Sequence, residues 1–189
     1  MTPLWLWLWS TLAYGAPWSV DAAGRLTAVG WTPSAQGGGV DLGAVAEVVG
    51  GERIRLAVGP RVTLDQTAML GTPLGLLATA ELLGRPCKRF WIDGRLVAGI
   101  ETSWLPTGWQ VDAGDLVRAP SRATVPAARV GLSLGLGPSF AVDQTNLRPF
   151  VRYEQSVILG FAPAADVPIM LRTTVAIGLA VDLPTARMP

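Results

Sequence analysis

Apolar and polar residues alternate along most of this chain. In residues 52–64, "ERIRLAVGPRVTL", aliphatic side chains take every second position from Ile54 onward, and Arg53, Arg55 and Arg61 take positions between them. A period of two places alternate side chains on opposite faces of a β-strand, whereas an amphipathic helix needs a period of about 3.6 residues. The pattern therefore predicts a strand with one aliphatic face and one basic face.

The same two-residue period recurs in six other segments: 40–49, 72–84, 88–104, 128–143, 151–161 and 169–183. A weaker strand over 26–31 brings the expected number to eight. Two kinds of connection alternate between them: short ones near 50–52, 84–87 and 143–147, and longer ones at 32–39, 65–72, 105–127 and 162–168. This alternation predicts an all-β, antiparallel, up-and-down meander, and transmembrane β-barrels share it.

Some local features of the sequence leave open how many strands form and whether each strand is regular. Asp93-Gly94 is a two-residue hairpin signal that would divide 88–104. Two further strands within 109–118 would make ten in all. Pro60 and Pro138 lie inside expected strands, where each removes a ladder donor, and each follows a glycine, which favours a β-bulge.

The composition of the two faces indicates which one lies inside. The charged face of 128–143 also carries Gly131, Ser133 and Gly135, whereas its other face is aliphatic without a break. Small residues suit the confined inside of a narrow barrel. A soluble barrel fills its inside with aliphatic side chains, and a membrane barrel exchanges the two faces. We therefore expect a membrane barrel, with the charged face toward the lumen.

Positive and negative side chains are equally numerous on this expected inner face. The positive set is Arg53, Arg55, Arg61, Arg89, Arg95, Arg129, Arg152 and Arg172; the negative set is Asp41, Glu47, Glu81, Asp93, Glu101, Asp143, Glu154 and Asp182. Because an isolated charge in a confined interior is costly, matched numbers favour mutual pairing and a largely closed lumen. The alternative is mixed charge on a solvated surface.

Four aromatic residues lie near the expected strand ends. Trp104 and Phe161 are next to long connections, and Phe90 and Phe140 are next to short ones. Membrane barrels carry an aromatic girdle at each interface. The four positions are those that two such girdles would require.

Composition excludes several classes of function. The 189 residues suffice for one domain with a core. Half of them are apolar and 15% are charged, which is a more apolar composition than a soluble domain of this size usually has. A net charge of +1 gives no support for a nucleic-acid partner. The chain has no histidine and one cysteine, Cys87. These absences exclude an intrachain disulfide, a Cys/His zinc site and imidazole catalysis.

The first 15 residues have the pattern of a secretory signal peptide. An apolar run from Leu4 to Ala13 is followed by small residues that fit cleavage after Gly15, although no Lys or Arg precedes the run. A buried N-terminal helix and a misassigned start codon are the alternatives. Residues 16–189 would then form a single β-barrel domain. No other stretch approaches a membrane-spanning helix, so a membrane location would require a closed barrel.

The segment "GLAVDL", residues 178–183, resembles the closing signal of bacterial outer-membrane barrels. Gly178 is followed at the fixed spacing by two outward hydrophobic positions, Val181 and Leu183. The usual terminal aromatic is replaced by Leu183, the usual polar residue by Ala176, and "PTARMP" follows. Together with the strand pattern and signal peptide, the chain resembles the small eight-stranded bacterial outer-membrane barrels. The resemblance implies periplasmic chaperones and the barrel-assembly machinery as transient partners.

The sequence offers little chemistry beyond the charged face. Asp112 and Asp115 could bind a divalent cation, but two carboxylates at this spacing in a loop are usually solvated. Trp109, in the same 105–127 loop, is a candidate contact for a protein partner outside the cell or for the membrane interface. Asp93, Arg95 and Glu101 share one row and could shape a conduit or fill the lumen.

The expected protein is therefore a nonenzymatic bacterial outer-membrane barrel with a charge-paired, largely closed lumen, in contact with outer-membrane lipids. We expect a structural or surface-interaction role, with no cofactor, metal or nucleic acid. The alternatives are a narrow channel for small solutes and a soluble, lipocalin-like binding barrel in the periplasm or outside the cell.

Overall fold

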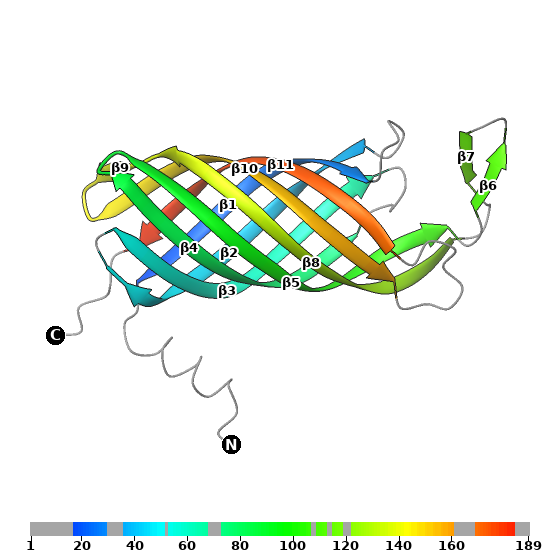
Figure 1. The fold of residues 1–189 in the computed structure, drawn as a ribbon, viewed down its shortest axis with the longest axis horizontal. Coiled ribbons are helices and arrows are strands. Elements are labelled where there is room, and N and C mark those ends of the chain that lie inside the picture. Colours follow the sequence, from blue (N-terminus) through cyan, green and yellow to red (C-terminus); the bar gives the residue numbers. More distant parts are fainter. Residues whose placement is uncertain are drawn as a thin grey trace, which may run out of the picture.

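The computed structural model describes residues 17–29, 36–51, 53–67, 73–106, 109–112, 115–118, 122–160 and 169–183. Eight long antiparallel strands form a closed barrel (Figure 1). They are β1 (Trp18–Val29), β2 (Gln36–Gly50), β3 (Ile54–Thr67), β4 (Leu74–Cys87), β5 (Phe90–Pro106), β8 (Arg122–Pro138), β10 (Thr145–Gly160) and β11 (Ile169–Leu183). In this described part of the chain, no helix is long and apolar enough to cross a membrane.

The first and last strands close the barrel. β1 pairs with β11 from Trp18 opposite Leu183 to Val29 opposite Arg172. The connections β2–β3 and β4–β5 are short, and they lie at the same end as the start of β1; we call this the turn end. β1, β3, β5 and β10 end at the opposite end of the barrel, which we call the loop end. The expected fold class, eight strands and alternating connections are confirmed.

Three short strands lie outside the set of eight. β6 (Trp109–Asp112) and β7 (Asp115–Arg118) pair only with each other, and Figure 1 shows this hairpin beyond the loop end of the barrel. β9 (Phe140–Val142) pairs with the first residues of β10. The ten-strand alternative is therefore wrong for the barrel wall. The hairpin alternative at Asp93-Gly94 is wrong as well, since β5 pairs with β4 and β8 straight through it.

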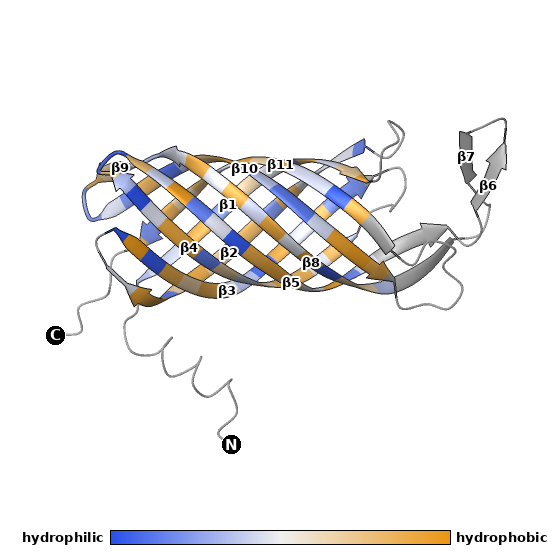
Figure 2. Ribbon diagram, viewed as in Figure 1, coloured by the Kyte–Doolittle hydropathy of each residue, from blue (hydrophilic) through white to orange (hydrophobic). Residues whose placement is uncertain are grey.

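Aliphatic residues form the outer wall of the barrel. Figure 2 shows hydrophobic and hydrophilic residues alternating along the strands. Thirty large hydrophobic side chains are exposed among the described residues, with Leu134 and Ile177 exposing 68% and 67% of their surface. A soluble protein rarely exposes a continuous apolar surface of this kind. This distribution is the reverse of that in a soluble ligand-binding barrel, and it argues against the lipocalin-like alternative.

The first strand begins earlier than the sequence pattern predicts. The expected strand over 26–31 is wrong, because β1 starts at Trp18 and ends at Val29. Ala22, Ala23 and Gly24 have low intrinsic strand propensity, which hides this part of β1. Ladder pairing with β2 on one side and β11 on the other holds the segment in a strand despite that propensity.

A β-bulge changes the face assignment near the end of β2. The register between β2 and β3 shifts between Glu47 and Val49. An unbroken alternation over 40–49 would place Val48 on the outer face with Val40 and Leu42. Val48 is only part-exposed, whereas Val49 exposes 63% of its surface. An extra residue in one strand moves every following side chain to the opposite face. The strict two-residue count therefore fails at Val48.

The two prolines are accommodated differently from each other, and neither lies at a bulge. Pro60 points outward opposite Ala78 of β4, and the β2–β3 ladder has the same register on both sides of it. Gly59 lets the β2 backbone approach so closely that an added Cβ would overlap the Ala44 carbonyl. Pro138 is the last residue of β8, so it interrupts no long strand.

Candidate functional site

Charged side chains fill the inside of the barrel. Among the described residues, nine arginines and nine carboxylates form ion pairs there, and they divide into two networks that no salt bridge joins. The loop-side network contains Arg25, Asp41, Arg61, Asp65, Glu101, Arg129, Glu154 and Arg172. The turn-side network contains Asp21, Glu47, Arg55, Glu81, Arg85, Asp93, Arg95, Arg148, Arg152 and Asp182.

The loop-side network is a continuous chain in which positive and negative groups alternate. Its order is Arg25, Asp65, Arg172, Glu101, Arg129, Glu154, Arg61 and Asp41. The Arg172 guanidinium lies 3.2 Å from Asp65 and 2.7 Å from Glu101. Every carboxylate except Asp41 lies between two arginines. Alternation of this kind compensates each buried charge locally, which an isolated charge in the interior could not achieve.

The turn-side network contains a four-membered ring. Arg95 lies 2.6 Å from Asp21 and 3.2 Å from Asp93, and Arg152 lies 3.3 Å from Asp21 and 2.9 Å from Asp93. Arg95 also contacts Glu81 at 2.6 Å, which extends the ring toward the turn end. These side chains are almost wholly buried, with at most 8% of any of them exposed. The ring is therefore a fixed part of the interior.

One pair in this ring crosses the whole lumen. Asp21 is on β1 and Arg95 is on β5, which is four strands away in the order of the barrel wall. In an eight-stranded barrel, strands four apart lie on opposite walls. A contact of 2.6 Å between them, with at most 8% of either side chain exposed, spans the lumen at that level. The geometry therefore describes a filled interior, as expected for the narrow inside of an eight-stranded barrel.

An aromatic pair fills the lumen toward the turn end. The rings of Trp91 and Phe150 meet edge to face, with centroids 6.3 Å apart and an interplanar angle of 73°. The guanidinium carbons of Arg148 and Arg152 lie 4.9 Å and 4.0 Å from the centroids of Trp91 and Phe150, respectively. The indole N–H of Trp91 donates to the Pro138 carbonyl at 2.9 Å. Cation–π contacts thus join this apolar plug to the ion-pair network.

Glycines make room for the buried carboxylates. Asp21 is paired with Gly43, and Asp65 is paired with Gly39, across adjacent strands. An added Cβ on either glycine would overlap a carboxylate oxygen of its partner. The small residues on the charged face therefore have a direct steric purpose: they let a carboxylate lie flat across the neighbouring strand.

Most of the residues expected in the lumen do lie there. Those are Arg55, Arg61, Asp93, Arg95, Glu47, Glu81, Glu101, Arg129, Arg152, Glu154, Arg172 and Asp182, together with Asp41. They come from seven of the eight long strands, so the sequence pattern identified the inner row of nearly every strand.

Three expected lumen residues lie elsewhere. Arg53 is exposed just before β3, Arg89 is exposed in the β4–β5 turn, and Asp143 is exposed in the turn before β10. Asp143 has a φ of 51°, a left-handed conformation that Asp tolerates in turns. In the sequence, the alternation continues past the ends of the strands, whereas the interior of the barrel stops at those ends. The assignment of these three residues to the lumen was therefore wrong.

Sequence reasoning missed five of the ion-pairing residues. They are Asp21, Arg25, Asp65, Arg85 and Arg148. Asp21 and Arg25 belong to the part of β1 that the pattern did not reveal. Asp65 and Arg85 lie at strand ends, within segments that the sequence assigns to connections. Arg148 directly follows the connection expected at 143–147. Trp91 and Phe150 were also missed, although Trp91 lies in the same alternating row as Asp93 and Arg95.

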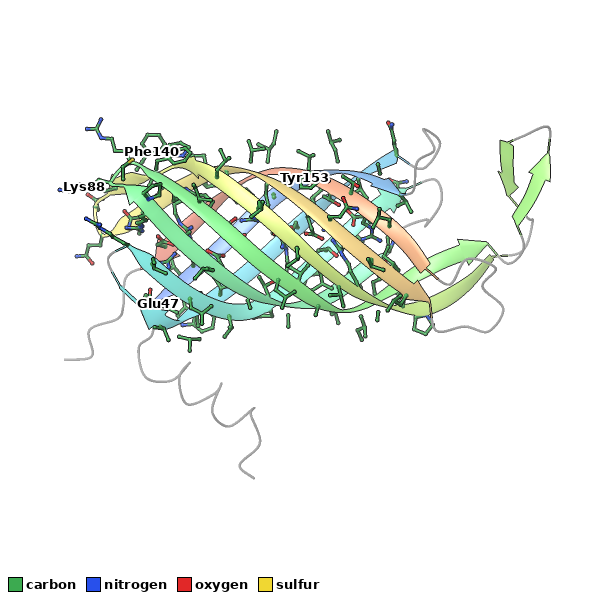
Figure 3. All side chains as sticks on the ribbon, viewed as in Figure 1. Glu47, Lys88, Phe140 and Tyr153 are labelled. Carbon is green, nitrogen blue, oxygen red and sulfur yellow. The ribbon has the colours of Figure 1, made fainter. Side chains whose placement is uncertain are left out.

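The remaining candidate residues lie at the barrel ends. Phe140 exposes 53% of its surface at the turn end (Figure 3). Phe90, the first residue of β5, is part-exposed at the same end. Phe161 lies outside the described residues. The other sequence candidates are at or beyond the loop end, and their side chains are outside the described part of the structure: Trp104, Trp109, Asp112 and Asp115. The two-girdle arrangement and the role of the long loop therefore stay predictions.

Comparison with known proteins gives similarity at the level of the fold. No protein-family model and no curated protein sequence matches this chain. The solved structure of Neisserial surface protein A superposes with a TM-score of 0.51 at 14% identity, covering 88% of this chain and 96% of that one. The attachment invasion locus protein Ail of Yersinia pestis gives 0.48 at 13% identity, covering 89% and 99%. The outer membrane protein OprG from Pseudomonas aeruginosa gives 0.43 at 12% identity, covering 90% and 97%.

The chain has the fold of the small bacterial outer-membrane barrels. The resemblance expected from "GLAVDL" and the strand pattern is confirmed at this level. At 14% identity, the likeness concerns the eight-stranded architecture and not the activity of the matched protein.

Proposed function

We propose that this protein is a nonenzymatic barrel of a bacterial outer membrane, with a closed lumen and a structural or surface-interaction role. The observation that carries the proposal is the inverted distribution of side chains. Paired charges fill the inside, and aliphatic residues cover the outside of all eight strands. Each strand has at least 12 residues, more than the roughly 9–11 that a tilted strand needs to cross a bilayer.

A lumen that is crossed by ion pairs supports a structural role over conduction. A channel for small solutes would need a continuous wet path, whereas the Asp21–Arg95 contact joins opposite walls. The Trp91–Phe150 pair fills a second level nearer the turn end. These contacts favour the closed, structural barrel over the narrow channel for small solutes.

The proposed partners follow from the placement in the membrane. Outer-membrane lipids would contact the aliphatic wall, and the barrel-assembly machinery would receive the chain during export through "GLAVDL". By analogy with barrels whose short turns face the periplasm, the loop end would face outward. The loop of residues 105–127 would then present the β6–β7 hairpin to the surroundings of the cell, where it is the candidate contact for a protein partner.

Membrane fractionation and heat-modifiable migration in detergent gels test the proposal first. We expect the mature chain in the outer-membrane fraction, with a folded form that migrates differently from the boiled form. A chain that stays freely soluble without detergent would contradict the membrane placement.

Spin labels give the sharper test, because they report which face contacts lipid. Single cysteines at Leu56, Leu132 and Asp143 would be introduced after Cys87→Ser, since Cys87 is exposed and free. At Leu56 and Leu132 we expect collisions with oxygen, which concentrates in lipid, to exceed collisions with a water-soluble nickel chelate. The label at Asp143, in an exposed turn, is the control and should show the opposite order.

A further inference from the structure

A small basic hollow opens at the turn end of the barrel. Its volume is about 150 Å³, and its lining includes Arg53, Arg55 and Arg85, together with Glu47 and Ile54. The three arginines come from two adjacent strands and the turn that precedes one of them. The hollow is large enough for a phosphate-sized group, and arginine is the side chain best suited to bind one, since its planar guanidinium donates two parallel hydrogen bonds.

Positive charge is in excess around this hollow. Arg55 and Arg85 both contact Asp182, at 3.1 Å and 3.4 Å, but Asp182 also contacts Arg148 at 2.8 Å. Glu47 lies 3.7 Å from Arg55. The turn-side network already matches its five arginines with five carboxylates. Arg53 is outside it, and no ion pair of Arg53 is found in the described part of the chain.

Neighbouring turn residues add to the positive charge. The Arg85 backbone N–H donates to the Arg53 carbonyl at 2.8 Å, which holds the β2–β3 turn against the end of β4. Lys88 and Arg89 are exposed in the β4–β5 turn that follows, and Figure 3 shows Lys88 at the same end of the barrel as Glu47. This part of the rim therefore attracts anions even before any specific contact forms.

The hollow also borders the aliphatic wall. Ile54, which lines it, exposes 64% of its surface, and Val49 and Leu82 on the adjacent strands expose 63% and 55%. A molecule that bound here would meet arginines at one end and an apolar surface at the other. This combination fits an amphiphile with an anionic head and hydrocarbon tails.

We infer that Arg53, Arg55 and Arg85 bind the phosphate of an anionic phospholipid headgroup. This inference rests on the proposed membrane placement, in which the turn end lies at the headgroups of the periplasmic leaflet. Clusters of basic residues at the edge of a membrane-embedded segment bind anionic lipids by charge attraction. Here the hollow adds fixed donors to that attraction, and Ile54 lies where the acyl chains begin.

Native mass spectrometry of the full-length barrel tests the inference. The protein would be released from mixed micelles that contain equal amounts of phosphatidylglycerol and phosphatidylcholine. We expect preferential retention of one phosphatidylglycerol molecule. Arg53→Gln should weaken that retention by about tenfold or more, because a hydrogen bond to a charged group is lost. The variant leaves all the ion pairs of both networks in place, so its fold is preserved.

Arg89→Gln is the matched control, because it removes the same charge from the same rim without lining the hollow. We expect its effect to stay below about twofold, the modest effect of an exposed, screened charge. An equal loss in Arg53→Gln and Arg89→Gln would show diffuse attraction and would overturn the site. Equal retention of the two lipids by the unmodified protein would overturn it too.

Competition with inorganic phosphate distinguishes a lipid headgroup from a free phosphate as the group that the arginines bind. In detergent micelles, phosphate should compete with phosphatidylglycerol only weakly, because it makes no contact with Ile54 and the aliphatic wall. Phosphate that binds as tightly as the lipid would replace the lipid assignment with a free-anion site. If the protein fails to enter bilayers, the membrane placement fails. The effect of Arg53→Gln on phosphate binding in micelles would still decide whether the arginines form an anion site.

Discussion

Asp93 and Gly135 face each other across β5 and β8, and the Asp93 carboxylate occupies the space that a side chain at position 135 would need. Arg152 lies against the same place: its Nη2 donates to Asp93 at 2.9 Å, and its Nε lies 3.3 Å from where a Cβ on Gly135 would stand. The glycine, the carboxylate and the guanidinium therefore fit together as one unit. The absence of a side chain is what permits the buried ion pair.

Gly135→Ala should destabilise the barrel by about 1–3 kcal/mol, the usual effect of overpacking an interior. The new methyl group would overlap the Asp93 carboxylate and displace it from Arg152. The measurement is the urea midpoint of unfolding in micelles, read from the heat-modifiable gel band. Gly24→Ala is the control, since a Cβ there meets nothing within 4 Å. Equal destabilisation by the two variants would contradict the steric explanation.

Glu101→Gln should be more damaging, at about 3–5 kcal/mol, because it leaves the four buried arginines of the loop-side network with only three carboxylates. Glu101 is 2% exposed, and it lies 2.7 Å from Arg172 and 3.7 Å from Arg129. The same urea midpoint measures the effect. Asp143→Asn makes the same chemical change in an exposed turn and should alter the midpoint little. A Glu101→Gln variant as stable as Asp143→Asn would show that the loop-side network does not depend on its charges.

Ion pairs inside the barrel should be almost insensitive to salt. Mobile ions screen exposed charges over about 10 Å at 0.1 M ionic strength, but they screen buried pairs much less. Arg129 and Glu154 are 0% and 4% exposed at their side chains. Raising NaCl from about 0.1 M to about 1 M should therefore leave the unfolding midpoint nearly unchanged. A steep fall in the midpoint with salt would indicate that water and ions enter the lumen freely.

The inner and outer faces could be predicted from the sequence because a two-residue period assigns faces without any knowledge of neighbours. Which charges meet could not be predicted. Asp21 and Arg95 are 74 residues apart, and they meet because closure of the sheet and the tilt of its strands bring β1 and β5 to opposite walls at one level. The hydrophobic pattern of a single strand carries no information on how the sheet closes or on how far its strands tilt.

The sequence pattern also did not show where the strands of the barrel begin and end. Arg53 and Arg89 continue the alternation of the strands beside them but lie in turns, whereas Arg148 lies in β10, just after the connection expected at 143–147. Arg148 shares the row of Phe150 and Arg152, so counting backward by two from Arg152 would have placed it in the lumen. The alternation was counted only over 151–161, whereas β10 begins at Thr145.

A closed lumen predicts the absence of steady conductance in planar bilayers. Asp21 and Arg95 join opposite walls, and Trp91 and Phe150 meet nearer the turn end. A lumen closed at these two levels would leave ions no continuous path. Purified protein should give no stable current steps, and Tyr153→Phe, an outer-wall control, should behave in the same way. Steady openings whose size changes in Arg55→Ala or Glu101→Ala would contradict the closed lumen, because these two side chains would then line a pathway instead of filling it.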